Sequence, residues 1–569
     1  MSTTSAIASR IGLRRRINIA SRLSAMAKAT PDATALVMPT GKVDGKYEYR
    51  SMTYAELDED SSRLAAGMIS YGLRPGTRIA LLVKPGIDFV SLTFALFKAG
   101  AVSILIDPGM GKKNLINCLE AADPHGFVAI PMAHVARLIH RRRFPNATMN
   151  VTVGRRWFWR GPTVAELRET KIGDFQPVAT AADDAAAIIF TTGSTGPPKG
   201  VLYQHRNFDN QVEQIRDRYN IQPGGVDLAG FPLFGLFNSA MGMTTIIPDM
   251  DASRPASVDP NAIVSAVRDW NVTQSFASPA VWNVVGDYCE KHDIVLPTLK
   301  RVLSAGAPVP PNVLAKMKRA IADEGEIYTP YGATEALPVA SISASEVLNE
   351  TAEQTADGAG TCVGKNYSGI EWKVIKVVEG PIESIDDAQP LPIGEIGELI
   401  VHGPVVTREY VTRVETNRLA KISENGHVWH RMGDVGYLDD DGRFWFCGRK
   451  AHRVLTENGT MYTVCCEAIA NQLPKVFRSA LVGVGDAGSQ TPIMICEPHK
   501  KDWPHSEEES EVLLREIREQ CASHRLTGAI KPEHILLHPS LPVDIRHNAK
   551  IFREELSVWA EQQLSCDAL

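Results

Sequence analysis

One segment constrains the fold more than any other: a loop rich in glycine and hydroxyl side chains directly follows a buried strand. The apolar run Ala186–Phe190 predicts the strand, and the loop Thr191–Gly200 has the sequence TTGSTGPPKG. Glycine lets the backbone approach an anion closely, and a lysine adds a mobile positive charge. We therefore predict a phosphate-binding loop whose ligands are Thr191, Thr192, Gly193, Ser194, Thr195, Gly196 and Lys199.

Two other interpretations of this loop are weaker. It differs from the Walker A loop of P-loop nucleotidases, because the spacing from glycine to lysine is wrong and no Ser or Thr follows Lys199. A flexible surface linker would be the plainer interpretation. The strand placed directly before the loop and the position of the lysine argue against such a linker.

Apolar strands alternate with amphipathic helices along much of the chain, which indicates an α/β fold. The pattern predicts a helix over Phe89–Lys98 and strands over Arg78–Val83, Ala101–Ile106, Gln274–Ala277 and Arg301–Ser304. Glu395–His402 and Arg443–Cys447 alternate in the manner of antiparallel strands. A chain of 569 residues is too long for one core, and we predict domains over 1–448 and 449–569, the second with a charged helix over Glu507–Glu519.

Composition excludes several classes of protein. A net charge of -6 gives no basic footprint for nucleic acid. Nine scattered cysteines without a C-x-x-C motif argue against a disulfide framework or zinc module and predict a reducing, cytoplasmic location. The start of the chain lacks the apolar core of a secretory signal. The uncharged run Leu228–Pro248 is long enough for a membrane span, but its glycines and prolines favour a buried loop and helix beside an apolar pocket.

Two further segments carry candidate ligands for a nucleotide. Tyr328–Glu335, with the sequence YTPYGATE, ends in a carboxylate, the kind of ligand that a hard cation such as Mg²⁺ prefers beside phosphate oxygens. A structural interpretation of Glu335 alone is a charge at a helix N-terminus. The short segment Ser304–Pro308, with the sequence SAGAP, consists of small residues that would leave room for a ligand.

The remaining motifs lie towards the C-terminus. Gly433–Tyr437 has the sequence GDVGY, and Gly448-Arg449 follows it after a predicted strand. His547–Ile551, with the sequence HNAKI, follows Leu541-Pro542. A lone Asp or Arg is usually a surface charge, so the functional interpretation depends on the order and spacing of the whole set.

In this order and spacing the motifs resemble those of the adenylate-forming superfamily of acyl-CoA synthetases, luciferases and peptide-synthetase adenylation domains. The resemblance covers essentially the whole chain. It implies an α/β fold with a large N-terminal domain of parallel and mixed sheets with helices, a β-barrel-like subdomain, and a small α+β C-terminal lid domain. It also implies an ATP- and Mg²⁺-dependent enzyme that activates a carboxylic acid as an acyl-AMP and releases pyrophosphate.

The same resemblance implies roles for individual residues. Tyr331 would lie near adenine, Asp434 would accept hydrogen bonds from the ribose hydroxyls, and Arg449 would contact ribose or phosphate. The implied adenine and ribose set is Gly306, Ala307, Tyr328, Tyr331, Gly332, Asp434 and Arg449. The implied catalytic set is Lys199, Thr334, Glu335 and Lys550. Thr334 would contact the α-phosphate, Glu335 would bind Mg²⁺, and Lys550 would enter the site from the small domain, although Asn548-Ala549 replaces the usual Ser-Gly before that lysine.

Three departures from the superfamily pattern point to a subfamily. Gly235 stands where many relatives carry histidine. The missing side chain would either leave space beside the reacting carboxylate, or Phe234 and Phe237 would fill that space. Ala451 replaces the usual Asp or Lys of the hinge, and the loop 457–464 replaces a glycine loop that lines the pantetheine tunnel. The implied acyl pocket consists of Phe231, Phe234, Gly235, Phe237 and Met241.

With the strings 201–207 and 246–255, these departures resemble the OleC-type β-lactone synthetases of bacterial olefin biosynthesis. That resemblance implies a long-chain 2-alkyl-3-hydroxy acid, whose own hydroxyl displaces AMP to close a β-lactone. It also implies other olefin-pathway enzymes as partners, a hydrolase-fold decarboxylase and a reductase. A long-chain fatty acyl-CoA ligase would share every ATP-site residue and is the alternative. A non-catalytic nucleotide-binding protein is the further alternative, although it has little use for Lys550.

Overall fold

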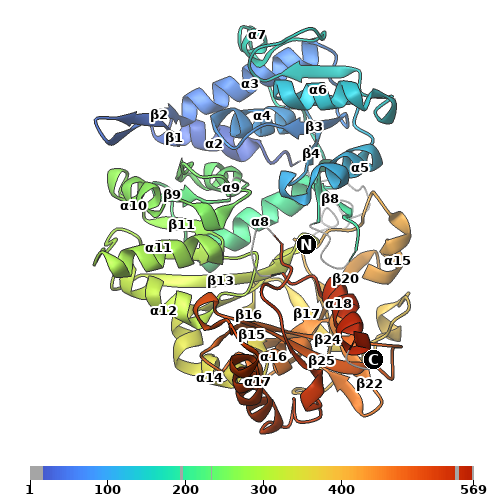
Figure 1. The fold of residues 1–569 in the computed structure, drawn as a ribbon. Coiled ribbons are helices and arrows are strands. Elements are labelled where there is room, and N and C mark those ends of the chain that lie inside the picture. The colour runs from blue at the N-terminus through green and yellow to red at the C-terminus, as the bar shows by residue number, and fades with distance from the viewer. Residues whose placement is uncertain (1–16, 192–195, 232, 545–549, 567–569) are drawn as a thin grey trace, which may run out of the picture.

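The computed structural model describes residues 17–191, 196–231, 233–544 and 550–566. Its upper part in Figure 1 is built on a sheet in which β3, β4, β5, β6 and β7 run parallel and β8 is antiparallel to β7. Across the sheet the order is β6 (Met149–Thr152), β5 (Gly126–Ala129), β3 (Arg78–Leu82), β4 (Val102–Leu105), β7 (Ala185–Phe190) and β8 (Gly200–Gln204). Strands of this buried kind read as continuous apolar runs, which is why β3, β4 and β7 were predictable.

A second sheet lies below the first in Figure 1. Its order is β16 (Lys365–Asn366), β14 (Ala336–Ser343), β13 (Glu326–Ala333), β12 (Arg301–Ser304), β11 (Gln274–Ala277), β9 (Val226–Ala229), β10 (Thr244–Ile246), β1 (Thr34–Val43) and β2 (Lys46–Thr53). Its central strands are parallel, and β2, β14 and β16 at the edges are antiparallel to their neighbours. Parallel strands place their carboxyl ends at one edge, where ligand-binding loops gather.

Helices cover these two sheets. In chain order they are α2 (Ser21–Ala29), α3 (Tyr54–Ser70), α4 (Ile87–Lys98), α5 (Lys112–Ala122), α6 (Pro131–Ile139), α7 (Val164–Arg168), α8 (His205–Arg218), α9 (Phe234–Met241), α10 (Pro260–Asp269), α11 (Pro279–Lys291), α12 (Pro311–Ala320), α13 (Ala344–Glu346) and α14 (Ala352–Ala356). A capping box between Thr53 and Glu56 begins α3. All residues of α4 except Asp88 are buried, so its sequence is mostly apolar.

A third sheet is entirely antiparallel and corresponds to the barrel-like subdomain that the resemblance implies. Its order is β15 (Thr361–Cys362), β21 (Phe444–Arg449), β20 (His427–Leu438), β18 (Gly397–His402) and β17 (Glu371–Ile375). β19 (Lys421–Glu424) also pairs with β20, and the short helix α15 (Asn417–Ala420) directly before β19 contacts both strands. β18 is buried from Gly397 to Val401 rather than on one face only. Its two faces contact different cores, because Leu399 and Val401 lie in one cluster and Ile400 in another.

The C-terminal part has its own sheet and cores. The hairpin β22 (Val454–Thr456) and β23 (Gly459–Met461) precedes α16 (Thr463–Ala470), β24 (Val476–Val484), β25 (Thr491–Pro498), α17 (Glu507–Ala522), β26 (Ile535–Leu537) and α18 (Arg553–Cys566). The buried residues of these two cores all lie at or beyond Val454. The predicted boundary at 448–449 falls near the end of β21.

The uncharged run 228–248 contains the end of β9, then α9 and β10. No helix in the described ranges is long and apolar enough to cross a membrane. The cysteines whose side chains the structure describes are free and buried, and the adjacent Cys465 and Cys466 both lie in α16.

Candidate active site

The predicted phosphate loop joins two antiparallel strands, β7 and β8. The Thr191 amide donates to the carbonyl of Lys199 at 3.0 Å, and the Lys199 amide donates to the Thr191 hydroxyl at 3.1 Å. These bonds close the base of the loop. Gly196 has a φ of +142°, which favours glycine. Thr192, Gly193, Ser194 and Thr195 lie outside the described residues.

A segment distant in sequence extends the edge of β8 and brings a tyrosine to the loop. The Gly200 amide donates to the Thr412 hydroxyl at 2.7 Å, and Val201 forms a bridge with Tyr410. A Cβ at position 200 would lie 3.0 Å from the Ile188 side chain and 3.1 Å from the Thr412 side chain, so a larger residue would need these neighbours to shift by a few tenths of an ångström. Tyr410 is therefore fixed beside Lys199.

Lys199, Glu335 and Tyr410 form the centre of the site. The Lys199 ammonium lies 4.8 Å from the centroid of the Tyr410 ring, and the Tyr410 hydroxyl donates to Glu335 Oε1. Burial lowers the pKa of Lys199, and the Glu335 carboxylate acts in the opposite direction. Glu335 is only 9% exposed and lies in the turn between β13 and β14. A lysine and a carboxylate held together near a glycine loop can bind phosphates and their counterion.

A second cluster unites three residues of the implied ribose set. The Tyr331 hydroxyl donates to Asp434 Oδ2, and Arg449 Nη1 donates to Asp434 Oδ1 at 2.6 Å. Asp434 on β20 pairs directly with Arg449 on β21, which explains why these two motifs lie together. Tyr331 thus directs its hydroxyl to the carboxylate. The buried Asp434 side chain is held in one orientation from both sides, as a ligand for two neighbouring hydroxyls requires.

The other implied adenine residues lie on the same edge of the second sheet. Gly306 has a φ of +98° in the loop after β12, beside Ala307. A Cβ at Gly332 would lie 2.7 Å from the Ala336 carbonyl, so only glycine fits the turn. Thr334 follows in this turn, and its carbonyl accepts a hydrogen bond from Tyr203 at 2.6 Å. Tyr328 lies earlier in β13, with its ring 4.9 Å from that of Tyr219.

Lys421 is a component that the sequence did not reveal. Its ammonium donates to the Thr407 carbonyl at 2.6 Å and lies 5.7 Å from the centroid of the Tyr410 ring. The Thr407 amide and hydroxyl in turn donate to the Glu335 carbonyl, both at 2.9 Å. Burial lowers the pKa of Lys421 to about 7, against the attraction of Glu335. Lys421 therefore supports the backbone behind Glu335.

We expect the thermal stability of the protein to rise, relative to a Lys421→Met variant, as the pH increases from about 7 towards about 10. In this window the unfolded chain keeps the proton on Lys421, whose ordinary pKa is 10.5, whereas the folded protein releases it. The unfolded state then binds more protons, so its population falls as the pH rises. Differential scanning fluorimetry across this range measures the effect. Exposed Lys300→Met is the control, and a Lys421→Met curve parallel to wild type would contradict the expectation.

Aromatic side chains form the wall of the implied acyl pocket. Phe234 stacks on Phe276 with ring centroids 3.6 Å apart, and Phe231 lies 5.1 Å from Phe276. Phe237 continues the wall 5.4 Å from Phe234. A Cβ at Gly235 would lie 3.4 Å from Thr245, an ordinary contact on the side of α9 that faces β10. The structure therefore places Gly235 among packed side chains next to the wall.

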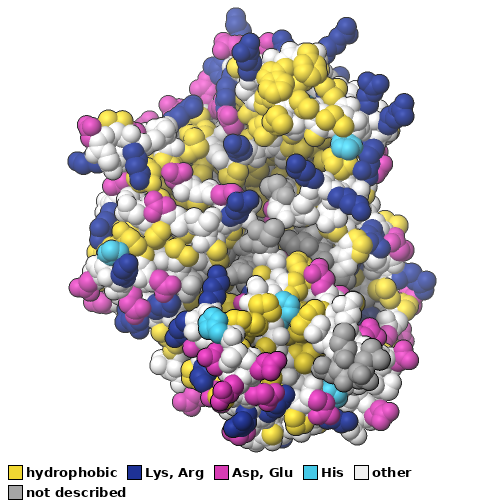
Figure 2. Space-filling view, in the orientation of Figure 1, with side chains coloured by type: hydrophobic (Ala, Val, Ile, Leu, Met, Phe, Trp, Pro, Cys, Tyr) yellow, Lys and Arg dark blue, Asp and Glu magenta, His cyan; other side chains and the backbone are white. Residues whose placement is uncertain are grey.

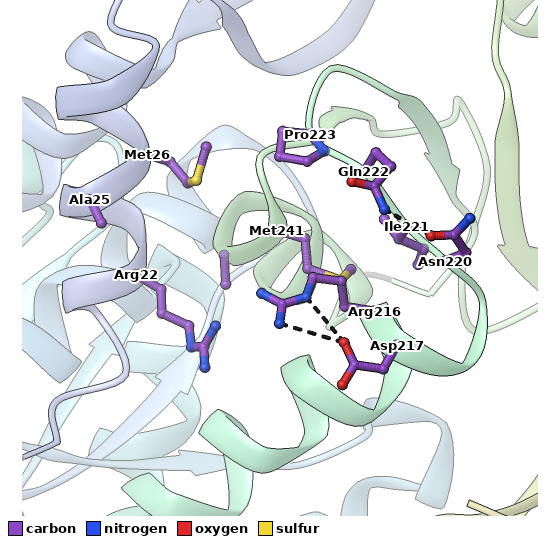
Figure 3. A pocket seen from close by; sticks show the side chains of 11 residues that line it. Arg22, Ala25, Met26, Arg216, Asp217, Asn220, Ile221, Gln222, Pro223 and Met241 are labelled. Carbon is purple, nitrogen blue, oxygen red and sulfur yellow. Dashed lines mark hydrogen bonds and ion pairs between the residues drawn. The ribbon is translucent and has the colours of Figure 1, made fainter. Parts of the chain in front are cut away.

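Met241 lies at the other end of α9 from Phe234. It lines an outer cavity of about 520 Å³ between α2, the end of α8 and the loop 220–223 (Figure 3). Arg22 in this cavity pairs with Asp209 and Glu213, and Arg216 pairs with Glu213 and Asp217. The two arginines that line this cavity are thus paired with carboxylates. Met241 lies one helical turn beyond Phe237 on α9, and the structure places it at this outer cavity.

Lys550 lies in the C-terminal part, directly after residues 545–549, which are outside the described residues. Its amide donates to Asp544 Oδ1 at 2.8 Å, and its carbonyl accepts from the Asp544 amide at 3.0 Å. Val543 and Ile551 form a bridge on either side of this pair. Leu541 and Ile551 pack on the core beneath β24 and β25. The backbone at Lys550 is therefore joined to Asp544 and held against the small sheet.

Comparisons with known proteins agree with this arrangement. A family model described as AMP-binding enzyme matches residues 23–411. The chain is 45% identical over 554 residues to the olefin beta-lactone synthetase of Xanthomonas campestris pv. campestris, covering 96% of this chain and 98% of that protein. It is 44% identical over 561 residues to the olefin beta-lactone synthetase of Stenotrophomonas maltophilia, covering 97% and 99%.

A solved structure shows the same fold. O-succinylbenzoate coenzyme A synthetase from Bacillus subtilis, in complex with ATP and a magnesium ion, superimposes with a TM-score of 0.72 at 20% identity. The superposition covers 94% of this chain and 98% of that one, so the large and the small parts are both included.

Proposed function

The chain belongs to the AMP-binding enzyme family and, within it, to the olefin beta-lactone synthetases. On this basis we propose the reaction that its active site catalyses. It is an adenylate-forming ligase that converts a long-chain 2-alkyl-3-hydroxy acid and ATP into a β-lactone, AMP and pyrophosphate. The observation that best supports adenylation is the convergence of Lys199 and Glu335 with Tyr410, beside the Tyr331–Asp434–Arg449 cluster. The two clusters also interact electrostatically, because burial lowers the pKa of Lys199 and the positive charge of Arg449 lowers it further.

In the first half-reaction the carboxylate of the acid attacks the α-phosphorus of ATP. A new carboxyl O–P bond forms, the bond from the α-phosphorus to the bridging oxygen breaks, and pyrophosphate leaves. Lys199 and Thr191 would bind phosphate oxygens, while Asp434 and Arg449 would hold the ribose. Lys550 would donate to the oxygens that gain negative charge in the transition state.

In the second half-reaction the β-hydroxyl of the bound acyl-AMP attacks its own carbonyl carbon. A C–O bond closes the four-membered ring, the bond to AMP breaks, and the hydroxyl proton passes to a base or to water. Tethering the nucleophile through two carbons raises its effective concentration far above that of a free thiol. The wall of buried Phe276 and partly buried Phe231 and Phe234 would help to exclude water from the activated acid.

Magnesium fits the site only as a companion of the nucleotide. No group of three or more His, Cys, Asp or Glu side chains in the described ranges could hold a metal ion alone. Glu335 supplies one buried carboxylate, and Mg²⁺ commonly binds one or two carboxylates together with substrate phosphates. When bound, the ion would neutralise charge on those phosphates. Tyr410 would keep the Glu335 carboxylate oriented towards them.

A Glu335→Gln variant is expected to need at least about tenfold more Mg²⁺ for half-maximal pyrophosphate release, because a carboxylate ligand is lost. The KM for the acid should change much less. A Mg²⁺ titration at saturating ATP measures this. Glu326→Gln, at the other end of β13, is the matched control and should titrate like wild type. A Glu335→Gln curve that coincides with wild type would remove Glu335 from the metal site.

Product analysis distinguishes the proposed function from that of an acyl-CoA ligase. The protein is incubated with ATP, Mg²⁺ and a racemic 2-alkyl-3-hydroxy acid, with and without CoA, and the products are identified by NMR. We expect β-lactone and AMP in both reactions. Thioester with CoA and no lactone without it would favour the ligase, and absence of any pyrophosphate would favour a non-catalytic binder.

The proposed chemistry also predicts the neighbouring reactions. A 3-hydroxy acid is the product of reducing a 3-keto acid, so a reductase would supply the substrate. A β-lactone loses CO₂ to give an alkene, so a decarboxylating enzyme would consume the product. We propose these two enzymes as partners and a cytoplasmic location, which the buried free cysteines support.

A further inference from the structure

In the N-terminal part, four large apolar side chains are exposed on α6 and on the loop after β6. Met132 and Ile139 on α6 are 65% and 73% exposed, and Trp157 and Phe158 in the loop after β6 are 50% and 76% exposed. Figure 2 shows hydrophobic side chains gathered over the region of α6 and α7 at the top of the molecule. We call Met132, Ile139, Trp157 and Phe158 the apolar surface.

The helix displays its half of this surface in a regular pattern. Met132 and Ile139 are seven residues apart, so they lie on the same face of α6 after two turns. His134 lies on the opposite, buried side, where its ring nitrogen Nε2 is 2.9 Å from the Val151 carbonyl. The exposed stripe is therefore fixed by packing of α6 on the sheet.

The loop displays Trp157 and Phe158 because its middle is anchored. Trp159 is buried, its Nε1 donates to the Thr152 hydroxyl at 2.8 Å, and its ring lies 5.2 Å from that of His134 on α6. The rings of Trp157 and Phe158 lie 5.7 and 5.3 Å from the Trp159 ring. The anchor thus places the loop beside α6 with two aromatic side chains directed outward.

Arginines lie next to the residues of the apolar surface in the sequence. Arg141 and Arg142 follow α6, and Arg155 and Arg160 flank the two exposed rings. All four are exposed, and in the described part of the chain none forms an ion pair with a carboxylate. Arg143 and Arg156 nearby are paired, with Glu120 and Glu166. The surface therefore carries an uncompensated positive charge of four guanidinium groups, which we call the arginine collar.

We propose that the apolar surface and the arginine collar dock the protein on an anionic lipid bilayer. Aromatic and aliphatic side chains enter the boundary between headgroups and acyl chains, and arginines beside them attract anionic headgroups. The positive charge of the arginine collar complements the negative charge of the bilayer, which favours this partner over an ordinary protein surface. The chain then lies on the membrane without spanning it.

The docking surface is distant in the fold from the ATP site. Its residues lie on α6, which follows β5, and on the loop after β6, and these two strands are at one edge of the first sheet. The phosphate loop joins β7 and β8 at the other edge. The effect of a substitution here on lipid binding can therefore be measured separately from its effect on catalysis. This inference goes beyond the proposed function, and it provides a reason for membrane contact, since a long-chain acid partitions into lipid.

The test is co-sedimentation of the full chain with sucrose-loaded vesicles of phosphatidylcholine, with and without phosphatidylglycerol. We expect binding to the phosphatidylglycerol vesicles that weakens as salt is added. The double variant Arg155→Gln/Arg160→Gln should lower the partition coefficient about 25-fold, since each arginine contributes about fivefold. Trp157→Ser/Phe158→Ser should lower it roughly 100-fold.

Phe477→Ser is the matched control, because Phe477 is 49% exposed on β24 of the small sheet. It should bind vesicles like wild type. All variants should release pyrophosphate normally with a short-chain, water-soluble 3-hydroxy acid, which shows that they are folded. Equal binding to both vesicle types, no binding to either, or equal losses in the control would overturn the proposal. Self-association that only the Trp157/Phe158 variant abolishes would instead assign the surface to a second copy.

Discussion

A Lys550→Ala variant is expected to form acyl-AMP about 10²-fold more slowly than wild type or worse, the loss observed when one preorganised donor to a developing negative charge is removed. The physical reason is that the backbone at Lys550 is bonded to Asp544 and that its neighbours Leu541 and Ile551 pack on the small sheet. A fixed backbone lets the ammonium be delivered without reorganisation. Rapid-quench measurement of pyrophosphate release in a single turnover gives the rate.

Lys550→Arg is the matched control, since it keeps the charge and tests whether the shape of the ammonium matters. The affinity for ATP, measured by calorimetry, should change little in either variant, because Lys199, Asp434 and Arg449 remain. If ATP affinity and turnover fell together, the small domain would be misfolded. If single-turnover adenylation stayed at the wild-type rate, Lys550 would have no role in it.

A long-chain 2-alkyl acid without the 3-hydroxyl is expected to be adenylated once and then to stall. The enzyme should release about one pyrophosphate per active site, and steady turnover should be lower by several orders of magnitude than with the hydroxy acid. The reason is that the internal nucleophile, with its high effective concentration, is missing. A burst experiment with radiolabelled ATP, followed by filtration of the protein with bound acyl-AMP, measures both quantities.

Addition of CoA distinguishes this stalled state from the intermediate of an acyl-CoA ligase. The stalled adenylate should persist, because the loop 457–464 lacks the glycine pattern of the tunnel in CoA-using relatives. Rapid conversion to thioester on addition of CoA would show that a free thiol reaches the carbonyl and would favour the ligase.

The sequence predicted those parts of the fold that depend on local patterns. The strands over Arg78–Val83 and Ala186–Phe190 are confirmed as β3 and β7, and the helix over Phe89–Lys98 as α4. Buried parallel strands and a buried helix leave apolar runs of characteristic length. The motif residues on β20 and β21 also meet as expected, because Asp434 and Arg449 are cross-strand partners.

The parts that escaped prediction depend on contacts between distant segments. Tyr410 reaches the site because its segment extends the edge of β8, more than 200 residues earlier in the chain. Lys421 looks like a surface charge in sequence, and only the pairing of β19 with β20 places it, partly buried, behind Glu335. Met241 shares a helix with Phe234, but the length of α9 separates the two ends.

The central claim is that the acid is activated as its adenylate and that its own hydroxyl closes the ring. Two substrates test it directly, one labelled with ¹⁸O in the carboxylate and one in the 3-hydroxyl, with mass spectrometry of AMP and lactone. Carboxylate label should appear in AMP, one oxygen per molecule, and the other should stay in the lactone carbonyl. Hydroxyl label should stay entirely in the lactone ring. Hydroxyl label found in AMP, or AMP without carboxylate label, would contradict the account.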